Sequence, residues 1–541
     1  MEHIKEYGAV GDGVADDTAA VRAAIATGEP LDWGGEGDVY RITDSLLIEP
    51  DAAVRWVSDG ATIRCDAPEA VQYVARIEAD GHPVCIDGPL TIDAAQNAFS
   101  CLSLRNEGAA APVTLTDVTA VNAYRASTSY TGGDGIGLRG AFDPIALIRP
   151  TVRNIRMATE AAVFGSQGIT GITVSAFDSA RMPGTVHIDS PTVENILSDN
   201  TETHMDQDGI RVMTANHETG VVAPYETQVR ITGGSIRNTG GRALKSQVAW
   251  CSISDVKVYR DVQRAPVFRE IDFQKGGGHV SNVSVHYVNT SSVSVVSFAT
   301  GGMPGATLPH ASVSGLKVLI EGEGHLTQIV TMRDMDGAGS RMVCRDMEVA
   351  GGTLDHLIRL DGTVGSDPIA ILSDVLAEPT VSAVATFYAN EWAGTVLLSN
   401  IVNPGPVVPL QYRTAGNTAT LNVRATNVIG VTVPEVPGEV LPLGDSVSGW
   451  AEVGGGSKAY RSGASVTYTF QLRGPSDGKI VHMMTLPPGW RPLSSGIAEL
   501  KTFRSGSSEG EVFIGTDGRV TAYRPTDQQE WSYGAITLPA A

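Results

Sequence analysis

The sequence predicts an all-β solenoid, a coil of short strands in which each turn stacks on the one before. The composition points this way, because 61 residues are glycine, only 6% are aromatic and only 18% are charged. Val, Ile, Thr and Ser occur in short bursts that Gly, Asn and Asp interrupt, as short strands and tight turns require. Two families of short strands also recur through residues 36–430, where helical periodicity is almost absent.

The first family follows a recurring turn signal. The interval between turns is roughly 21 to 44 residues, within the range of solenoid repeats. These turns are Thr116-Asp117, Arg149-Pro150, Asp189-Ser190, Gly233-Gly234, Ser254-Asp255, Ser281-Asn282, Ser314-Gly315, Arg345-Asp346, Ser373-Asp374 and Ser399-Asn400.

The second family consists of apolar strands between those turns, in phase with the first. The triplets begin at Ile136, Ala162, Ile210, Ala243, Val267, Val293, Ile329 and Leu357. Two strand families in phase describe the faces of one coil.

The two ends differ from the repeat. In the predicted N-terminal cap, 1–35, glycines near Asp12 predict turns, and Asp16, Asp17 or Thr18 can cap a short helix with Val21 and Ala24 on its apolar side. Such a helix would cover the first rung. Proline is dense in 431–444, which predicts a linker. Beyond it, 445–541 predicts a β-sandwich, with strand-like runs at Ser465–Leu472, Ile480–Leu486, Glu511–Ile514, Arg519–Tyr523 and Gly534–Leu538.

The charge excludes several classes of partner. With a formal net charge of −21, the chain has no basic stripe for nucleic acid or for an anionic membrane. A strongly anionic polymer would also be repelled unless the binding groove of the protein is locally basic or holds a cation. The N-terminus lacks a secretory signal pattern and no apolar run could span a membrane, so synthesis in the cytoplasm is expected. The five scattered cysteines predict buried free thiols, and neither a metal site nor a cofactor is predicted.

The segment YGAVGDGVADDTAAVRAAI at 7–25 resembles the N-terminal motif of pectate-lyase-type β-helix proteins, which many phage tailspikes share. LPPGWRPLSSG and FIGTDGRVTAY are similar to small sandwich domains that close phage tail and spike proteins. This resemblance implies a right-handed parallel β-helix and a homotrimer on a virion surface. It also implies that the protein recognises, and often cleaves, a bacterial surface polysaccharide. Tailspikes commonly carry a separate N-terminal particle-binding domain, whereas the motif here begins at Tyr7, so attachment would need a separate base or adaptor protein.

Three successive rungs, 204–212, 240–247 and 268–274, carry the candidate site. If the apolar residues point inward, Arg211, Lys245 and Gln247 point outward, and Asp206 and Asp208 lie at the preceding turn. Strict alternation also places Glu270 and Asp272 together on the outer face. A slip of one residue would invert these assignments.

Paired carboxylates suit glycoside hydrolysis, where one protonates the leaving oxygen and the other activates water or attacks the sugar. The candidate catalytic residues are Asp206, Asp208, Glu270, Asp272 and Lys245; in a lyase, Lys245, Arg242 or His204 would act as the base. The candidate substrate-binding residues are Arg211, Arg242, Gln247, Trp250, Phe268 and Tyr287, whose aromatic members can stack on sugars.

Each of these assignments has a structural alternative. Asp208-Gly209 is ordinary turn chemistry, and Arg242, Lys245 and Glu270 could form an ion pair between rungs. Asp206 and Asp208 could hold a cation, and the aromatic side chains could pack in the core or at a trimer contact. Two functions besides a glycan-cleaving spike therefore stay open: a receptor-binding spike without catalysis, and a free bacterial polysaccharide lyase or hydrolase.

Overall fold

The computed structural model describes most of the N-terminal two thirds of the chain and the strands beyond it. The described residues are 1–127, 133–161, 168–175, 184–200, 206–213, 228–248, 250–262, 267–274, 276–299, 311–333, 341–361, 369–377, 385–390, 394–402, 408–409, 411–413, 421–429, 431–432, 439–442, 451–452, 458–462, 465–473, 481–486, 496–502, 508–514, 516–517, 519–523 and 532–539.

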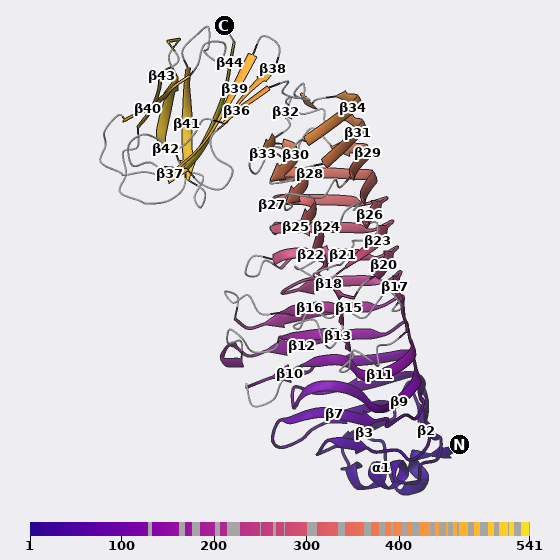
Figure 1. Cartoon of the computed structure of the whole chain (residues 1–541). Helices are drawn as coiled ribbons and strands as arrows, with labels where there is room; N and C mark the ends of the chain where they lie inside the picture. Colours follow the sequence, from indigo (N-terminus) through magenta and orange to yellow (C-terminus); the bar gives the residue numbers. More distant parts are fainter. Residues whose placement is uncertain are drawn as a thin grey trace.

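Within the described residues, one 33-stranded sheet with parallel pairing winds around one axis, so the main domain is a parallel β-helix, as predicted (Figure 1). The strands stack into three columns, called here face 1, face 2 and face 3. The strands that lie on face 1 alone are β4 (Leu46–Ile48), β7 (Val71–Glu78), β13 (Ile169–Ser175), β16 (Gln207–Met213), β19 (Leu244–Gln247), β22 (Val267–Phe273), β25 (Ser292–Ala299), β30 (Ala385–Asn390) and β33 (Gln411–Arg413).

Faces 2 and 3 are built in the same way. Face 2 holds β1 (Glu2–His3), β2 (Leu31–Gly35), β5 (Val54–Asp59), β14 (Thr185–Asp189), β17 (Gln228–Thr232), β20 (Trp250–Ser254), β23 (Gly277–Ser281) and β26 (Ala311–Ser314). Face 3 holds β3 (Val39–Ile42), β6 (Thr62–Cys65), β10 (Tyr124–Arg125), β12 (Thr151–Met157), β15 (Thr192–Ser198), β18 (Ser235–Thr239), β21 (Lys257–Arg260) and β24 (Ser284–Val288).

Longer strands bend around the corners and serve more than one face. These are β8 (Val84–Asp93), β9 (Ala98–Val121), β11 (Asp134–Ile148), β27 (Lys317–Arg333), β28 (Arg341–Asp361), β29 (Ile369–Ala377), β31 (Gly394–Val402) and β34 (Leu421–Ile429). The short strands β32 (Val408–Pro409) and β35 (Val431–Thr432) pair with each other, and η2 (Thr159–Ala161) is a single 3₁₀ turn.

Stacked apolar side chains form the core. On face 1 the register places Ile210 beside Leu244 and Leu244 beside Ile271, and all three are buried. Because each rung presents an apolar residue at the same position, the core is continuous along the coil and each rung is covered by its neighbours.

The turn between faces 2 and 3 confirms the predicted repeat. A residue with positive φ occurs at all ten predicted turns, and Asp255, Asn282 and Gly315 are three successive examples. Asn and Asp tolerate this left-handed conformation better than most residues and glycine adopts it freely, which explains the turn signals in the sequence.

The N-terminal cap also matches the prediction. Helix α1 (Thr18–Ile25) follows η1 (Ile4–Tyr7), and its Val21 and Ala24 are buried in the core. Asp17 precedes the helix, but its carboxylate accepts hydrogen bonds from the backbone N–H groups of Val10 (2.6 Å) and Gly11 (3.1 Å). It therefore ties the glycine-rich turn to the helix instead of capping the helix with its side chain.

The described C-terminal strands form a nine-stranded antiparallel sheet. Four of the five strand-like runs predicted there lie within its strands, and the fifth, Ile480–Leu486, overlaps β40 over Val481–Thr485. The strands are β36 (Glu439–Pro442), β37 (Ala451–Glu452), β38 (Lys458–Ser462), β39 (Ser465–Arg473), β40 (Val481–Thr485), β41 (Gly496–Thr502), β42 (Ser508–Ile514), β43 (Arg519–Tyr523) and β44 (Ser532–Pro539). The sheet begins inside the segment 431–444 that the sequence predicts as a linker, because β36 pairs with β38.

All five cysteines carry free thiols, and four of them, Cys65, Cys101, Cys251 and Cys344, are buried as expected. Within the described residues, none of the helices is both long and apolar enough to cross a membrane.

Candidate functional site

The outer side of face 1 carries polar residues in a spacing that strict alternation does not produce. On each strand two successive residues point into the core, and polar residues flank them at i and i+3. We call these flanking residues the outer stripe. Its pairs are Thr170 and Thr173, Asp208 and Arg211, Arg242 and Lys245, Arg269 and Asp272, Ser294 and Ser297, Gln328 and Thr331, and His356 and Arg359.

The first of the two inward positions explains the spacing. It is Gly209 on β16, where a Cβ atom would lie 2.9 Å from Cγ2 of Ile236 on face 3, and Ala243 just before β19, which is fully buried. The strand enters face 1 from a tight corner, so this residue turns toward the core together with the residue that follows it. Two inward residues in succession then shift the outward ones to a spacing of three.

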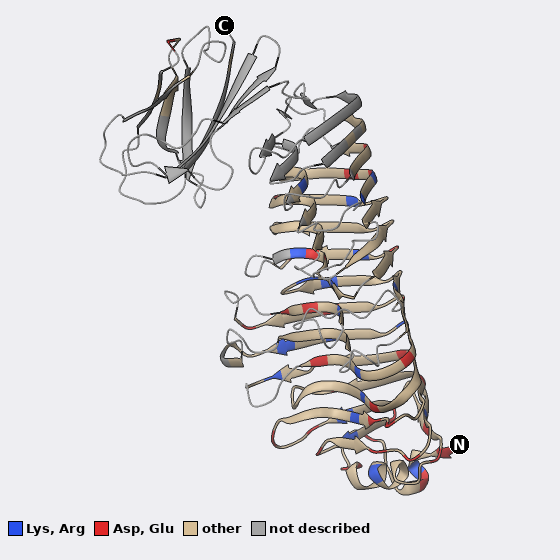
Figure 2. Ribbon diagram, in the orientation of Figure 1, with Lys and Arg blue, Asp and Glu red and all other residues tan. Residues whose placement is uncertain are grey.

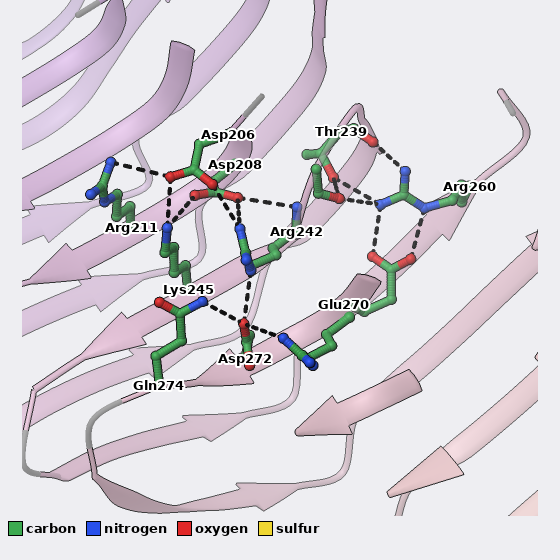
Figure 3. Close-up of polar contacts among 12 residues, drawn as sticks. Asp206, Asp208, Arg211, Thr239, Arg242, Lys245, Arg260, Glu270, Asp272 and Gln274 are labelled. Carbon is green, nitrogen blue, oxygen red and sulfur yellow. Dashed lines mark hydrogen bonds and ion pairs between the residues drawn. The ribbon is translucent and has the colours of Figure 1, made fainter. Parts of the chain in front are cut away.

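A charged cluster occupies the outer stripe on β16, β19 and β22 (Figure 3). The register places Arg211 beside Lys245 and Lys245 beside Asp272. Nζ of Lys245 lies 2.7 Å from Asp206 and 3.8 Å from Asp208. Asp206, Asp208 and Lys245, which the sequence analysis places in neighbouring rungs, therefore lie side by side.

Arg242 joins the carboxylates of this cluster. Its guanidinium donates to Asp206 at 2.9 Å and to Asp272 at 2.8 Å, and lies 3.5 Å from Asp208. Gln274 donates to the same oxygen of Asp272 at 2.8 Å, and Arg269 lies 3.6 Å from it. The arrangement joins three rungs through ion pairs, and the side chain of Asp206, 32% exposed, is its most accessible carboxylate.

The surroundings move the pKa values of the carboxyl groups apart. Burial raises the pKa of Asp208, and the neighbouring charge of Asp206 raises it further. Burial acts in the same direction on Asp206, but Lys245 and Arg242 outweigh it and hold its pKa below the usual range. Burial is likewise outweighed at Asp272, whose pKa is lowered by Arg242 and Arg269.

Glu270 does not belong to this cluster, which corrects the predicted outward pair of Glu270 and Asp272. Glu270 occupies the first inward position on β22 and is fully buried. Both of its oxygens accept hydrogen bonds from Arg260 on β21, at 2.7 and 2.8 Å (Figure 3). Arg260 also donates to the hydroxyl and the carbonyl oxygen of Thr239, so this buried ion pair braces faces 1 and 3.

The predicted aromatic contacts are also placed differently. Tyr287 on β24 is fully buried beside Glu270, and burial and that charge raise the pKa of its phenol well above its ordinary value. It cannot stack on a sugar from there. Trp250 is half-buried on face 2, away from the cluster. The side chain of Phe268 lies outside the described residues, as do His204 and the predicted strand that begins at Ala162.

The sequence-based search missed the continuation of the stripe toward the C-terminus. Asp272 is in register with Ser297, which is in register with Thr331. In the same way Arg269, Ser294 and Gln328 are in register. A search for two apolar residues between polar ones at i and i+3 would have found these positions.

These side chains are buried, yet several of their polar atoms lack partners. Among the described residues, no hydrogen-bond partner exists for Asp272 Oδ1, Gln247 Oε1, Ser294 Oγ, Ser297 Oγ, Gln328 Oε1 and Thr331 Oγ1. A buried polar atom without a partner costs about 1–3 kcal/mol. Five of these six atoms belong to the outer stripe, so the stripe holds polar groups whose hydrogen bonds the described residues do not supply.

The acidic residues of the cluster are paired with side-chain cations. Across the described part of the chain, no group of three or more His, Cys, Asp or Glu side chains could hold a metal ion. A metal ion at Asp206 and Asp208 would lie beside the positive charges of Lys245 and Arg242, which would repel it. Figure 2 shows charged residues scattered along a coil whose ribbon is mostly uncharged.

No family model and no curated protein matches the chain. Solved structures do resemble it. An N-terminal fragment of bacteriophage Phi29 gene product 12 has a TM-score of 0.41 at 13% identity, with 79% of this chain and 71% of that chain covered. A tailspike protein double mutant of the E. coli bacteriophage HK620 has a TM-score of 0.36 at 9% identity, covering 100% and 93%.

The A-module of the Azotobacter vinelandii mannuronan C-5 epimerase AlgE4 gives 0.34 at 13% identity, covering 77% of this chain and 100% of that chain. Another mutant of the HK620 tailspike was solved in complex with a pentasaccharide. The solved structures to which this chain is similar are mostly phage tailspike proteins.

Proposed function

We propose that the chain binds a bacterial surface polysaccharide along the outer stripe of face 1, as the spike of a phage-like particle. The observation that carries this proposal is the row of buried polar atoms without partners in the outer stripe, from Asp272 on β22 to Thr331 on β27. Their positions repeat from rung to rung at about 4.8 Å. A polysaccharide presents hydroxyl groups at regular intervals along its length, so it can supply hydrogen bonds to successive rungs.

Two further features belong to this proposal. The spike assembles as a homotrimer, and it is mounted on the particle through a separate base or adaptor protein. The formal charge of −21 disfavours nucleic acid as the partner. Without the phage context, the same stripe would serve a free bacterial polysaccharide lyase or hydrolase.

Cleavage of the bound glycan is the second candidate function. The opposite pKa shifts of Asp206 and Asp208 favour it. When the surroundings move the pKa values of two carboxyl groups apart, one stays protonated and can act as an acid, and the other is ionised and can act as a base. Asp208 would hold the proton, and the ionised Asp206 would act as base or nucleophile. However, both carboxylates are already paired with Lys245 and Arg242, so neither is free to act on a glycosidic bond in this arrangement. Binding is therefore the better supported function.

The test is to incubate the purified chain with capsule, exopolysaccharide and lipopolysaccharide from candidate hosts, and then to measure both binding and glycan length. Binding to a polysaccharide is the expected result, and its loss in a Thr331→Val, Ser297→Ala double variant would locate it on the stripe. The control is Glu348→Gln, which changes an exposed ion pair with Lys317 on face 3. Failure to bind any glycan would refute the proposal.

The same samples test cleavage. Shortened glycan chains would establish a depolymerase, and unsaturated uronate ends would identify a lyase. Loss of shortening in Asp206→Asn with binding retained would support the acid and base roles. Binding without shortening would leave an adhesion spike in which the carboxylates connect the rungs.

A further inference from the structure

We infer that the outer stripe has two sections and that its ligand is an acidic heteropolysaccharide, with a sugar carboxylate over β16, β19 and β22 and a neutral sugar over β25 and β27. This inference rests on the proposed function, because it names the class of glycan that the same stripe takes. The two sections are called the charged section and the neutral section.

The charged section is locally basic in an acidic chain. Its four cations, Arg211, Arg242, Lys245 and Arg269, outnumber its three carboxylates, Asp206, Asp208 and Asp272. The excess grows when Asp208 holds a proton, which its burial and the charge of Asp206 favour. The formal charge of −21 repels an anionic glycan from the chain as a whole, so such a glycan requires a locally basic surface of this kind.

Arg211 has donors to spare. Its ion pair with Asp206 is long, at 3.7 Å, and its buried Nε has no hydrogen-bond partner among the described residues. A guanidinium has five N–H donors in a planar fork that fits a carboxylate. Lys245 and Arg242, by contrast, already make short contacts with Asp206. A sugar carboxylate therefore binds at Arg211, where it adds a partner without breaking the network.

The neutral section has a different chemistry. Ser294, Ser297, Gln328 and Thr331 are at most 2% exposed, and each has one polar atom without a partner. Hydroxyl and amide groups both donate and accept, as do the hydroxyl groups of a neutral sugar. The rungs β16 and β25 are three steps apart, so a carboxylate at Arg211 lies roughly 14 Å along the stripe from the neutral section. A glycan made only of acidic sugars or only of neutral sugars would match one of the two sections poorly.

The experiment begins with an array of purified bacterial capsular polysaccharides and O-antigens, both with and without uronic acids. The best-bound acidic polymer is then treated so that its carboxyl groups are reduced to alcohols. This treatment leaves the protein unchanged, so a folding defect cannot explain the result. We expect the affinity for the reduced polymer to fall at least tenfold, and the affinity for the native polymer to fall as salt is raised.

Variants complete a thermodynamic cycle. Arg211→Gln is expected to lose about tenfold in affinity for the native polymer and little for the reduced one, because the reduced polymer has no carboxylate for Arg211 to bind. The double variant Ser297→Ala, Thr331→Val is expected to weaken binding of both polymers equally. Ser252→Ala on face 2 is the matched control and should bind both polymers as the wild-type chain does.

The outcomes separate the inference from the proposed function. Equal binding of native and reduced polymers, or array hits among neutral glycans, would overturn the acidic class while polysaccharide binding stands. An equal loss for both polymers in Arg211→Gln would show that no carboxylate binds there, which also overturns the inference. If the array gives no binding at all, the proposed function itself fails.

Discussion

At the scale of the residue, Asp206 and Asp208 show how one site can hold two carboxyl groups in different states. Both contact Lys245 and Arg242, but Asp208 is fully buried whereas the side chain of Asp206 is 32% exposed. The buried group loses more solvation when it ionises, so it retains its proton to higher pH.

The pH dependence of stability follows from these directions. The folded-state pKa of Asp206 is lowered, so its ionised carboxylate stabilises the folded chain above the unfolded pKa of about 3.9. This stabilisation is lost as the pH falls through the folded-state pKa. The folded-state pKa of Asp208 is raised, so its effect is a destabilisation that grows as the pH rises through that pKa. Asp208→Asn is therefore expected to stabilise the chain at pH 8 and to have little effect near pH 4.

Asp206→Asn provides the matched comparison, with the opposite result. It should destabilise the chain at pH 7 by about 1–3 kcal/mol, because the buried ammonium of Lys245 loses its closest partner. Urea unfolding of both variants across pH checks this. If Asp208→Asn instead destabilised the chain at pH 8, the fold would favour the ionised carboxylate, and the pKa of Asp208 would not be raised.

The buried pair of Arg260 and Glu270 supports a second prediction. Glu270→Gln removes one charge and leaves Arg260 buried without a counterion, so the expected loss is about 3–5 kcal/mol. The double variant Arg260→Met, Glu270→Leu should recover part of this loss, because no charge stays buried. Unfolding in denaturant measures both variants, and Glu348→Gln on the surface should change stability by less than about 1 kcal/mol. Equal losses in the single and double variants would argue against the ion pair as the cause.

At the scale of the element, the turns between faces 2 and 3 determine the path of the chain. Gly315 has a φ of 63° at the position that Asn282 occupies one rung earlier with a φ of 51°. Gly315→Val is expected to cost about 1–2 kcal/mol, since a branched residue is poorly tolerated in this conformation. Gly315→Asn should be nearly neutral, because the neighbouring rung already holds asparagine there. Thermal unfolding of the two variants tests this, and similar losses for both would point to crowding by Asn282 instead of backbone strain.

The same elements show what the sequence could and could not predict. Turns were predictable because each needs a residue that tolerates positive φ, so Asp117 and Asn400 are visible without a structure. The strands of face 1 were not fully predictable, because alternation fails where two residues turn inward at the corner. That is why Asp272 belongs to the outer stripe, whereas Glu270 lies in the core beside Arg260. The missed residues Ser294 and Gln328 follow the same spacing of three.

At the scale of the whole molecule, the outer side of face 2 changes character along the coil. Its stacked positions are polar over β17, β20, β23 and β26, where Arg230, Ser252, His279 and Ser312 lie in register. The next three positions are Val343, Ile371 and Leu397, all half-buried in the single chain. Contiguous apolar side chains on an outer surface mark a site of association.

This apolar patch supports the proposed homotrimer, and the last prediction concerns it. A cyclic trimer brings the same elements of three chains together around one axis, so a single substitution is repeated in every contact. Ile371→Lys would bury a charge there and is expected to shift the native mass from three chains to one while the folded β-helix is retained. Ser252→Lys places the same charge on the same face among polar positions and should leave the trimer intact. Native mass spectrometry at micromolar concentration checks both. If the wild-type chain is a monomer, or if Ile371→Lys is still a trimer, then the patch does not hold the copies together and another surface must cover it.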